Sequence, residues 1–262
     1  MSSYRINRLF DGRSGRCLDV AVDHGFFGEP AFLTGITDIA RTVDVLVQAA
    51  PDAVQLTVGQ AVHLQSRPGR DKPALVLRSD VANVYGPVLP SSLHSLTIAR
   101  AAETAARLDA VCLVVNLFDV PGQPELRRQC LENVVRLKAE CEPLGMPLMV
   151  EPLVMRAGGA GGPYQVDGDV DRITALVRQA VELGADLVKA DPTDDPSDYG
   201  RVVEVAGAVP VLVGDQVAHP PQRERHQPVR PHPGRAQLRQ QPGDRHQPGE
   251  PAGDGERLAV VV

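Results

Sequence analysis

The chain has 262 residues, of which 43% are hydrophobic, and a formal net charge of -6 at pH 7. This acidic balance disfavours partners such as nucleic acid or a membrane surface, since both attract a basic protein face. No apolar run reaches the roughly 20 residues of a membrane span, and residues 1–11 lack the apolar core of a signal peptide. The four cysteines show no CxxC or disulfide-dense spacing, so we expect a cytoplasmic protein that acts on a small molecule.

Short β-branched runs alternate with segments of helical period up to about Val213, which is typical of a parallel α/β sheet. The predicted strands are 17–23, 53–58, 74–80, 110–118, 147–152, 186–191 and 209–213. The predicted helices are 38–49, 96–107, 124–141, 170–183 and 198–206. No Gly-x-Gly-x-x-Gly turn follows the first strand, so the pattern favours a TIM (β/α)8-type barrel over a dinucleotide-binding sheet.

The composition changes abruptly after the seventh predicted strand. Residues 214–257 are dense in Pro, Arg, Gln, His and Gly, contain no aromatic residue and have no period of 3.6 or 2. We therefore predict a barrel domain over 1–213 and a disordered tail over 214–262, with at most a weak strand at 258–262. The tail is either a native interaction segment or the product of a shifted reading frame. We favour the shift, because the change begins where an eighth strand should follow, which leaves the barrel incomplete after the seventh.

Lys189 is the residue that most needs a chemical explanation. It is one of three lysines, against 24 arginines, and it lies within an apolar predicted strand. Burying an ammonium group is costly, so a sequence that otherwise avoids lysine is expected to keep this one for its chemistry.

Strand parity groups other polar residues with this lysine. Alternate residues of each barrel strand face inward, and those at the carboxyl ends face the pocket where barrel enzymes act. The inward polar residues at these strand ends are Asp23, Gln55, Thr57, Arg78, Asp80, Asn116, Glu151 and Asp191. Singly, each is expected to be a water-exposed residue at a loop edge. Together they predict a polar cavity around Lys189.

A buried lysine amine supports Schiff-base chemistry. Its ordinary pKa is about 10.4, and desolvation or a nearby cation is expected to lower it toward about 7 to 8. Arg78 could supply that positive field. The neutral amine can then attack a ketone or aldehyde, and Asp23, Glu151 and Asp191 are candidates for moving the protons. The structural alternative is a salt bridge from Lys189 to Asp23 or Asp191. This chemistry needs neither a metal nor another cofactor.

Three motifs carry a resemblance that covers residues 10–213. They are Asp-Val-Ala-Val-Asp-His-Gly at 19–25, Gly-Ala-Asp-Leu-Val-Lys at 184–189 and Val-Pro-Val-Leu-Val at 209–213. In this order and spacing, they resemble the class I, Schiff-base aldolases of the DeoC/LacD type, most closely the archaeal-type fructose-bisphosphate aldolase group. The resemblance implies a lyase that cleaves or forms a carbon-carbon bond of a small phosphorylated ketose.

The resemblance implies that Lys189 is the Schiff-base lysine and Asp23 a proton-transfer residue. Where the archaeal group has Tyr-Pro this chain has Glu151-Pro152, which makes Glu151 the candidate acid. Gln55, Thr57, Arg78, Asn116 and Asp191 are the candidate substrate-binding residues.

The family's phosphate-binding glycines after the last strands are largely missing, since only Gly214 remains before Asp215. Two alternatives stay open: an acyl or ketol transferase on the same scaffold, and an inactive barrel remnant with an interaction tail. A complete barrel is expected to form a homo-oligomer.

Overall fold

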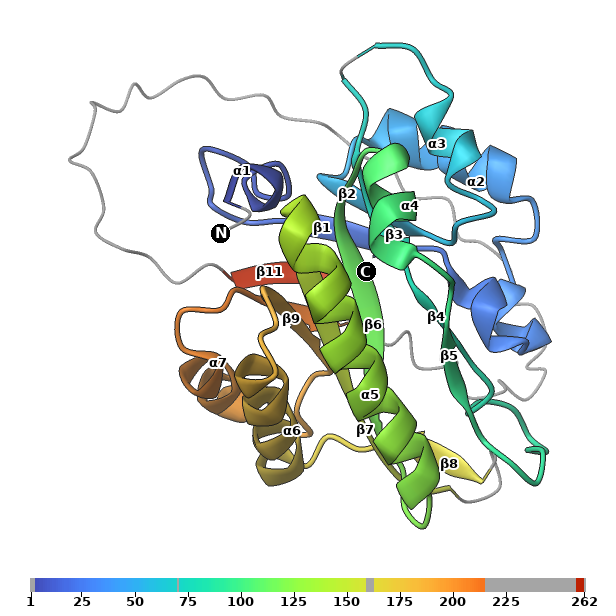
Figure 1. Cartoon of the computed structure of the whole chain (residues 1–262), viewed down its shortest axis with the longest axis vertical. Coiled ribbons are helices and arrows are strands. Elements are labelled where there is room, and N and C mark those ends of the chain that lie inside the picture. Colours follow the sequence, from blue (N-terminus) through green and yellow to red (C-terminus); the bar gives the residue numbers. More distant parts are fainter. Residues whose placement is uncertain (1–2, 70, 159–162, 215–257, 262) are drawn as a thin grey trace, which may run out of the picture. The chain divides into compact units, whose positions relative to one another are not determined.

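The computed structural model describes residues 3–69, 71–158, 163–214 and 258–261 (Figure 1). In this part of the chain, eight strands form a closed ring of parallel pairings. In ring order they are β1 (Leu18–Ala21), β2 (Ala53–Leu56), β3 (Ala74–Arg78), β6 (Ala110–Asp119), β7 (Leu148–Ala157), β9 (Leu187–Ala190), β10 (Val211–Gly214) and β11 (Leu258–Val261). The fold is an α/β barrel, and all seven strands predicted from the sequence are confirmed, most of them a few residues shorter.

The eighth place in the ring is taken by β11, which falls where the sequence allowed a weak strand at 258–262. This strand pairs with β10 on one side and β1 on the other, and Val260 is the register partner of both Val213 and Leu18. A run of Leu, Ala, Val and Val suits a strand because apolar and β-branched side chains pack well on a pleated surface. Residues 215–257, on which most of the predicted tail falls, lie outside the described residues.

The principal helices are α2 (Ile39–Ala49), α4 (Ala101–Arg107), α5 (Pro124–Cys141), α6 (Val170–Glu182) and α7 (Tyr199–Ala206). They confirm the five predicted helices, with one boundary wrong. Residues 96–100 are not helical, because Ser95–Thr97 forms β5, which pairs antiparallel with β4 (Asp80–Ala82). The side chains of Ser95 and Thr97 turn to one face of that hairpin and Leu96 to the other, so a strand period competes with the helical one.

Shorter elements connect these. They are α1 (Ser3–Ile6), α3 (Val62–Gln65), the 3-10 turns η1 (His24–Phe27), η2 (Pro30–Leu33), η3 (Glu142–Leu144) and η4 (Pro196–Asp198), and β8 (Tyr164–Val166), antiparallel to β7. α5 contacts β6 and β7 along its length and covers them on the outside of the barrel (Figure 1). None of the helices in the described ranges is long and apolar enough to cross a membrane.

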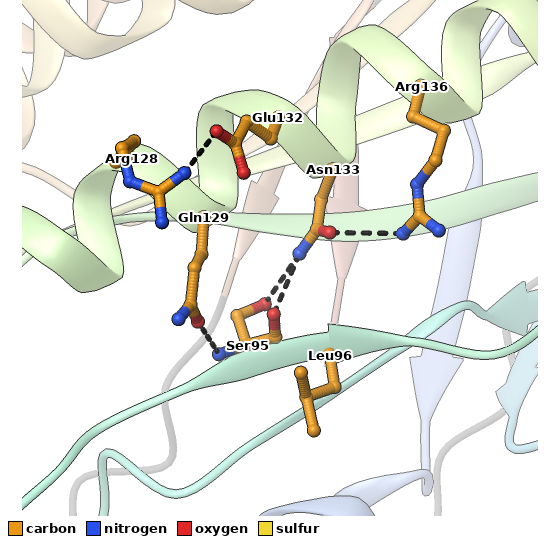
Figure 2. Close-up of a pocket in the computed structure, with 7 residues that line it drawn as sticks. All are labelled: Ser95, Leu96, Arg128, Gln129, Glu132, Asn133 and Arg136. Carbon is orange, nitrogen blue, oxygen red and sulfur yellow. Dashed lines mark hydrogen bonds and ion pairs between the residues drawn. The ribbon is translucent and has the colours of Figure 1, made fainter.

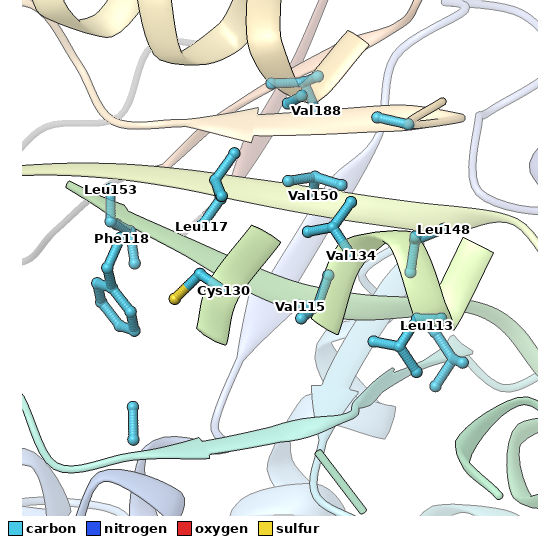
Figure 3. Packing of buried hydrophobic residues seen from close by; sticks show 14 of the residues in the cluster. Leu113, Val115, Leu117, Phe118, Cys130, Val134, Leu148, Val150, Leu153 and Val188 are labelled. Carbon is cyan, nitrogen blue, oxygen red and sulfur yellow. The ribbon is translucent and has the colours of Figure 1, made fainter. Parts of the chain in front are cut away.

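Two separate apolar clusters confirm the inward and outward parity of the strands. In the outer cluster, Leu113, Val115 and Leu117 of β6 pack with Val134 of α5 and Val150 of β7 (Figure 3). On β9, Val188 and Ala190 also belong to this outer cluster, while Leu187 belongs to the inner one.

The inner cluster fills the barrel interior toward the amino-terminal ends of the strands. Its buried members are Leu9, Cys17, Ala53, Val76, Val111, Cys112, Val114, Met149, Leu187 and Leu212, with Ile6 and Phe10 packed against them. The residues of the same parity further along the strands are polar, so the barrel has an apolar floor and a polar upper layer near the carboxyl ends of its strands.

Candidate active site

Lys189 lies in the polar layer, and its side chain is almost fully buried. It is 5% exposed, and its Nζ atom forms an ion pair with Oε1 of Glu151 at 3.0 Å. Nζ also donates a long hydrogen bond of 3.5 Å to Oε1 of Gln55. The carboxylate that pairs with Lys189 is thus Glu151, whereas the structural alternative considered from the sequence was a salt bridge to Asp23 or Asp191.

Arg78 connects three buried carboxylates across the top of the barrel. Its Nε donates to Oδ2 of Asp23 at 2.6 Å, and its Nη2 donates to Oε2 of Glu151 at 2.6 Å. Its Nη1 is 3.4 Å from Oδ1 of Asp80. Gln55 donates from Nε2 to the same Asp23 oxygen at 2.8 Å. Asp23, Gln55, Arg78, Asp80, Glu151 and Lys189 thus form one hydrogen-bonded network, which we call the lysine cluster.

Residues outside the lysine cluster also hold Asp80 through hydrogen bonds. Its Oδ2 accepts hydrogen bonds from Nδ2 of Asn116 at 2.9 Å and from Oγ of Ser95 at 3.1 Å. Ser95 is held in turn by Asn133 of α5, whose Nδ2 donates to the Ser95 carbonyl oxygen at 2.9 Å (Figure 2). This chain of contacts ties the cluster to the helical layer.

A surface pocket of about 540 Å³ lies at Ser95 and Asn133, and no residue of the lysine cluster lines it. It is lined by Ser95, Leu96, Arg128, Gln129, Glu132, Asn133 and Arg136 (Figure 2). Arg128 is already paired with Glu125 and Glu132, so the pocket presents largely compensated charge. We assign no chemistry to it.

The field of Arg78 keeps two of its carboxylate partners, Asp23 and Glu151, ionised, whereas burial raises the pKa of the third, Asp80. Burial works to raise the pKa of Asp23, but the positive charges of Arg78, His24 and Lys189 outweigh it and hold that pKa at about 2. Burial opposes ionisation of Glu151 as well, yet Arg78 and Lys189 lower its pKa below the ordinary value. Both carboxylates are therefore ionised in the resting site.

The predicted lowering of the Lys189 pKa is wrong for the resting site. Burial does lower it, and so does the charge of Arg78, as expected. The negative charges of Glu151, Asp19 and Asp23 outweigh both effects, and the net pKa is raised. The resting amine is an ammonium, and a base must take its proton before it can attack a carbonyl.

The structure brings together most of the residues predicted for the site. Direct contacts join Lys189, Glu151, Arg78, Asp23 and Gln55, and Asn116 reaches them through Asp80. The other two predicted residues, Thr57 and Asp191, are buried just beyond the ends of β2 and β9.

Thr57 accepts from the backbone N–H groups of Gln60 and Ala61 through its own carbonyl oxygen. Asp191 lies beside Gly214. The sequence interpretation missed Asp19, which parity alone would have found, since it lies four residues before Asp23 on the same strand face.

Replacing Arg78 is expected to destabilise the fold strongly. Arg78→Met leaves Asp23, Asp80 and Glu151 buried without their shared cation, and breaking a buried pair in this way costs about 3–5 kcal/mol. Arg78→Lys should recover only part of this, because one ammonium cannot contact three carboxylates in the guanidinium geometry. The free energy of unfolding from chemical denaturation checks it.

Arg128→Met is the matched control, since it removes an arginine paired with two glutamates on an exposed helix face, where such pairs contribute about 0–1 kcal/mol. An Arg78→Met variant as stable as the Arg128→Met variant would contradict the role given to Arg78.

This arrangement defines a class of protein: a parallel barrel with a buried lysine and ionised carboxylates near the carboxyl ends of its strands, as in barrel enzymes that form Schiff bases. Residues 17–214 match the DeoC/LacD family of aldolases, and the chain belongs to that family.

Three known proteins illustrate the similarity. The chain is 30% identical to an uncharacterized aldolase of Saccharolobus solfataricus, with 81% of this chain and 75% of the relative covered. It is 29% identical to a 3-hydroxy-5-phosphonooxypentane-2,4-dione thiolase of Photorhabdus laumondii, with 71% and 57% covered. A solved Schiff-base-forming fructose-1,6-bisphosphate aldolase superimposes with a TM-score of 0.63 at 25% identity, with 81% and 80% covered. The protein is thus a TIM-barrel lyase of the aldolase family.

Proposed function

We propose that this aldolase cleaves or forms a carbon-carbon bond of a small phosphorylated ketose through an imine at Lys189. The observation that carries the proposal is the buried Lys189 amine held 3.0 Å from the Glu151 carboxylate. The phosphorylated ketose is proposed from the printed names of the similar proteins, two of which act on phosphorylated compounds.

Glu151 is the proposed base that activates the amine. It takes a proton from the Lys189 ammonium, whose nitrogen lone pair then attacks the carbonyl carbon of the ketose. The carbonyl oxygen takes up a proton, and after a second proton transfer it leaves as water, so that a protonated imine remains. This cation draws toward nitrogen the electrons of the bond between the α and β carbons. As the β-hydroxyl gives up its proton, that bond breaks to an enamine and an aldehyde.

Asp23 is the proposed acid-base partner at the reacting hydroxyl. It is fixed by Arg78 and Gln55 through one oxygen, Oδ2, so that Oδ1 is left for a proton of the substrate. Gln55, Arg78 and Asn116 are proposed to bind substrate oxygens through their N–H groups. Thr57 and Asp191 remain proposed binding residues at the same end of the barrel.

Product analysis tests the function directly. The purified chain is incubated with ketose 1-phosphates and 1,6-bisphosphates of different stereochemistry, and released aldehyde and dihydroxyacetone phosphate are measured. Release of both in equal amounts supports aldol cleavage.

The runner-up, an acyl or ketol transferase, is favoured by the thiolase relative. It requires the carbon fragment to appear on an added acceptor. A protein that gives neither product with any ketose is the inactive remnant.

Changing Glu151 to Gln is expected to slow turnover by on the order of 10² or more, because it removes the base at the amine while keeping the side chain's shape. The loss should be largest at neutral pH and smaller at high pH, where solvent hydroxide can deprotonate Lys189. The pH profile of kcat is the measurement. Glu132→Gln, on an exposed helix face, is the control and should leave the profile unchanged. An unaltered rate and profile for Glu151→Gln would reject its assignment as the base.

We further propose that the enzyme works as a cytoplasmic homo-oligomer. All four cysteines are free thiols and buried, which fits a reducing compartment. Exposed apolar side chains on the outer helices, among them Val45 of α2 and Val135 of α5, offer surface for self-association. Light scattering on the purified chain measures the oligomeric state.

A further inference from the structure

Asp19 of β1 is a buried carboxyl that the proposed mechanism does not use. It is fully buried, and neither of its carboxyl oxygens has a hydrogen-bond partner in the described part of the chain. Its register partner on β2 is Ala53, a member of the inner apolar cluster. Residues opposite one another on neighbouring strands face the same way, so the Asp19 side chain points into the barrel, between the apolar floor and the lysine cluster.

The charges in the barrel interior do not balance when every group is ionised. The described residues of the lysine cluster include two cations, Arg78 and Lys189, and three carboxylates, Asp23, Asp80 and Glu151, each of which contacts one of those cations. An ionised Asp19 would add a fourth negative charge with no cation or N–H donor in contact with it among the described residues. Uncompensated buried charge is avoided by taking up a proton. Asp19 is therefore the carboxyl that best accommodates one.

We propose that Asp19 is a positioning residue that titrates together with Lys189, taking up a proton when the lysine loses one. The role that we give to this coupled titration rests on the proposed imine chemistry, but the coupled titration itself does not. When Lys189 is an ammonium, its charge favours the Asp19 carboxylate. When Lys189 becomes a neutral amine, that charge disappears and Asp19 takes up a proton. Counted together with Asp19, the lysine cluster keeps the same net charge once Glu151 has released the proton that it took from Lys189.

Among the described residues, the titratable groups that act most strongly on Asp19 lie on inward strand faces or just beyond the strand ends. From β1 these are Cys17 and Asp23, from β3 Arg78, from β6 Cys112, from β7 Glu151 and from β9 Lys189. Burial raises the pKa of Asp19 to about 7, and Asp23 and Glu151 add to the rise, while Lys189 and Arg78 oppose it. The pKa values of both thiols are also raised, mainly by burial, so these thiols stay neutral and supply no compensating charge.

Infrared difference spectroscopy of the protonated carboxyl group tests the coupling without substrate. The wild-type chain should show a carboxylic-acid band that titrates near pH 7, and Asp19→Asn should lack it. Lys189→Met removes the opposing cation and should move the titration midpoint upward by about one pH unit or more. Lys138→Met is the matched control, because Lys138 is half-buried and paired with Asp186, and it should leave the midpoint unchanged.

The result that overturns the inference is a midpoint that Lys189→Met does not move, or that Lys138→Met moves equally. If Asp19→Asn does not fold, the two lysine variants still decide the matter, since both retain Asp19. We expect the Asp19→Asn variant to fold and to be at least as stable as the wild type at pH 8. An acid whose pKa is higher in the native state than its ordinary 3.8 destabilises that state as the pH rises from about 4 to 7, and the amide avoids this.

The purpose of the coupling is tested separately by imine trapping. Asp19→Asn removes a negative charge that raises the Lys189 pKa, so the pH at which half-maximal trapping occurs should fall. A wild-type protein that forms no imine at any pH rejects the proposed function and leaves the infrared result standing. If Asp19→Asn gives a normal imine yield and the same pH of half-maximal trapping as the wild type, the role of Asp19 is rejected and the proposed function stands.

Discussion

Replacing Lys189 with Arg or Met should abolish turnover, with a loss of at least about 10³-fold in kcat, because Lys189 is the one amine of the lysine cluster that can form the imine. Arginine keeps a cation opposite Glu151, so the fold should survive. Its guanidinium does not lose its proton at neutral pH and cannot act as the nucleophile. Methionine removes the charge and leaves Glu151 with Arg78 as its remaining cationic partner. Steady-state kinetics on a cleaved ketose phosphate provides the measurement.

The other two lysines are natural controls. Lys72 donates to backbone carbonyl oxygens of Leu64, Gln65 and Arg67, and Lys138 pairs with Asp186. Their arginine variants should retain wild-type kcat within a few-fold. Activity that survives Lys189→Arg but falls with Lys72→Arg or Lys138→Arg would place the nucleophile elsewhere.

Asp23→Asn should lower kcat by on the order of 10² to 10⁴, the usual range for the loss of a general acid or base. The amide keeps the shape of the carboxylate and can still accept a hydrogen bond from Arg78 through its oxygen. KM should change much less than kcat, since the substrate oxygens keep their other donors. The matched control is Asp44→Asn, which removes a half-exposed carboxylate paired with Arg67.

The pH dependence of Asp23 separates its chemical role from a structural one. Its native pKa of about 2 lies below the ordinary 3.8, so its ion pair stabilises the fold above about pH 4, and this contribution is lost as the pH falls toward 2. Asp23→Asn should therefore weaken the acid dependence of unfolding. An Asp23→Asn enzyme that loses stability but retains its kcat would reduce Asp23 to the structural role.

Parity was enough to predict from the sequence most of the residues that the structure brings together in the lysine cluster. A strand places alternate side chains on one face, and barrel strands place their carboxyl ends around one opening. Lys189 fixed the inward set on its own strand, and the same rule located Gln55, Arg78 and Glu151 on strands far apart in the chain. The motif around Asp23 and the lysine motif then identified the family from residues that the structure places in one network.

The ionisation states could not be predicted in the same way. The direction in which the Lys189 pKa shifts depends on the distances to Glu151 of β7 and to Asp19 and Asp23 of the first strand segment. Their negative charges together outweigh burial and the positive charge of Arg78. A sequence supplies the residue types but not those distances. The predicted start of α4 was wrong for a related reason, because strand pairing between Ser95–Thr97 and Asp80–Ala82 outweighs the local helical pattern.

The origin of residues 214–257 stays a prediction, as does the domain boundary at Val213. A shifted reading frame predicts that another frame of the coding DNA continues into a glycine-rich loop and a strand after Val213. A native tail predicts that no such frame exists. The sequenced coding DNA, translated in all frames, separates the two, and a frame-restored version can be compared in solubility and thermal unfolding.

Borohydride trapping with peptide mass spectrometry tests the central claim most directly. The chain is incubated with dihydroxyacetone phosphate or a cleaved ketose phosphate, reduced with borohydride and digested. The account predicts one stable adduct, on the peptide that contains Lys189, and no adduct in the Lys189→Arg variant. An adduct on Lys72 or Lys138, or an enzyme that turns over its substrate and yields no adduct at all, would contradict it.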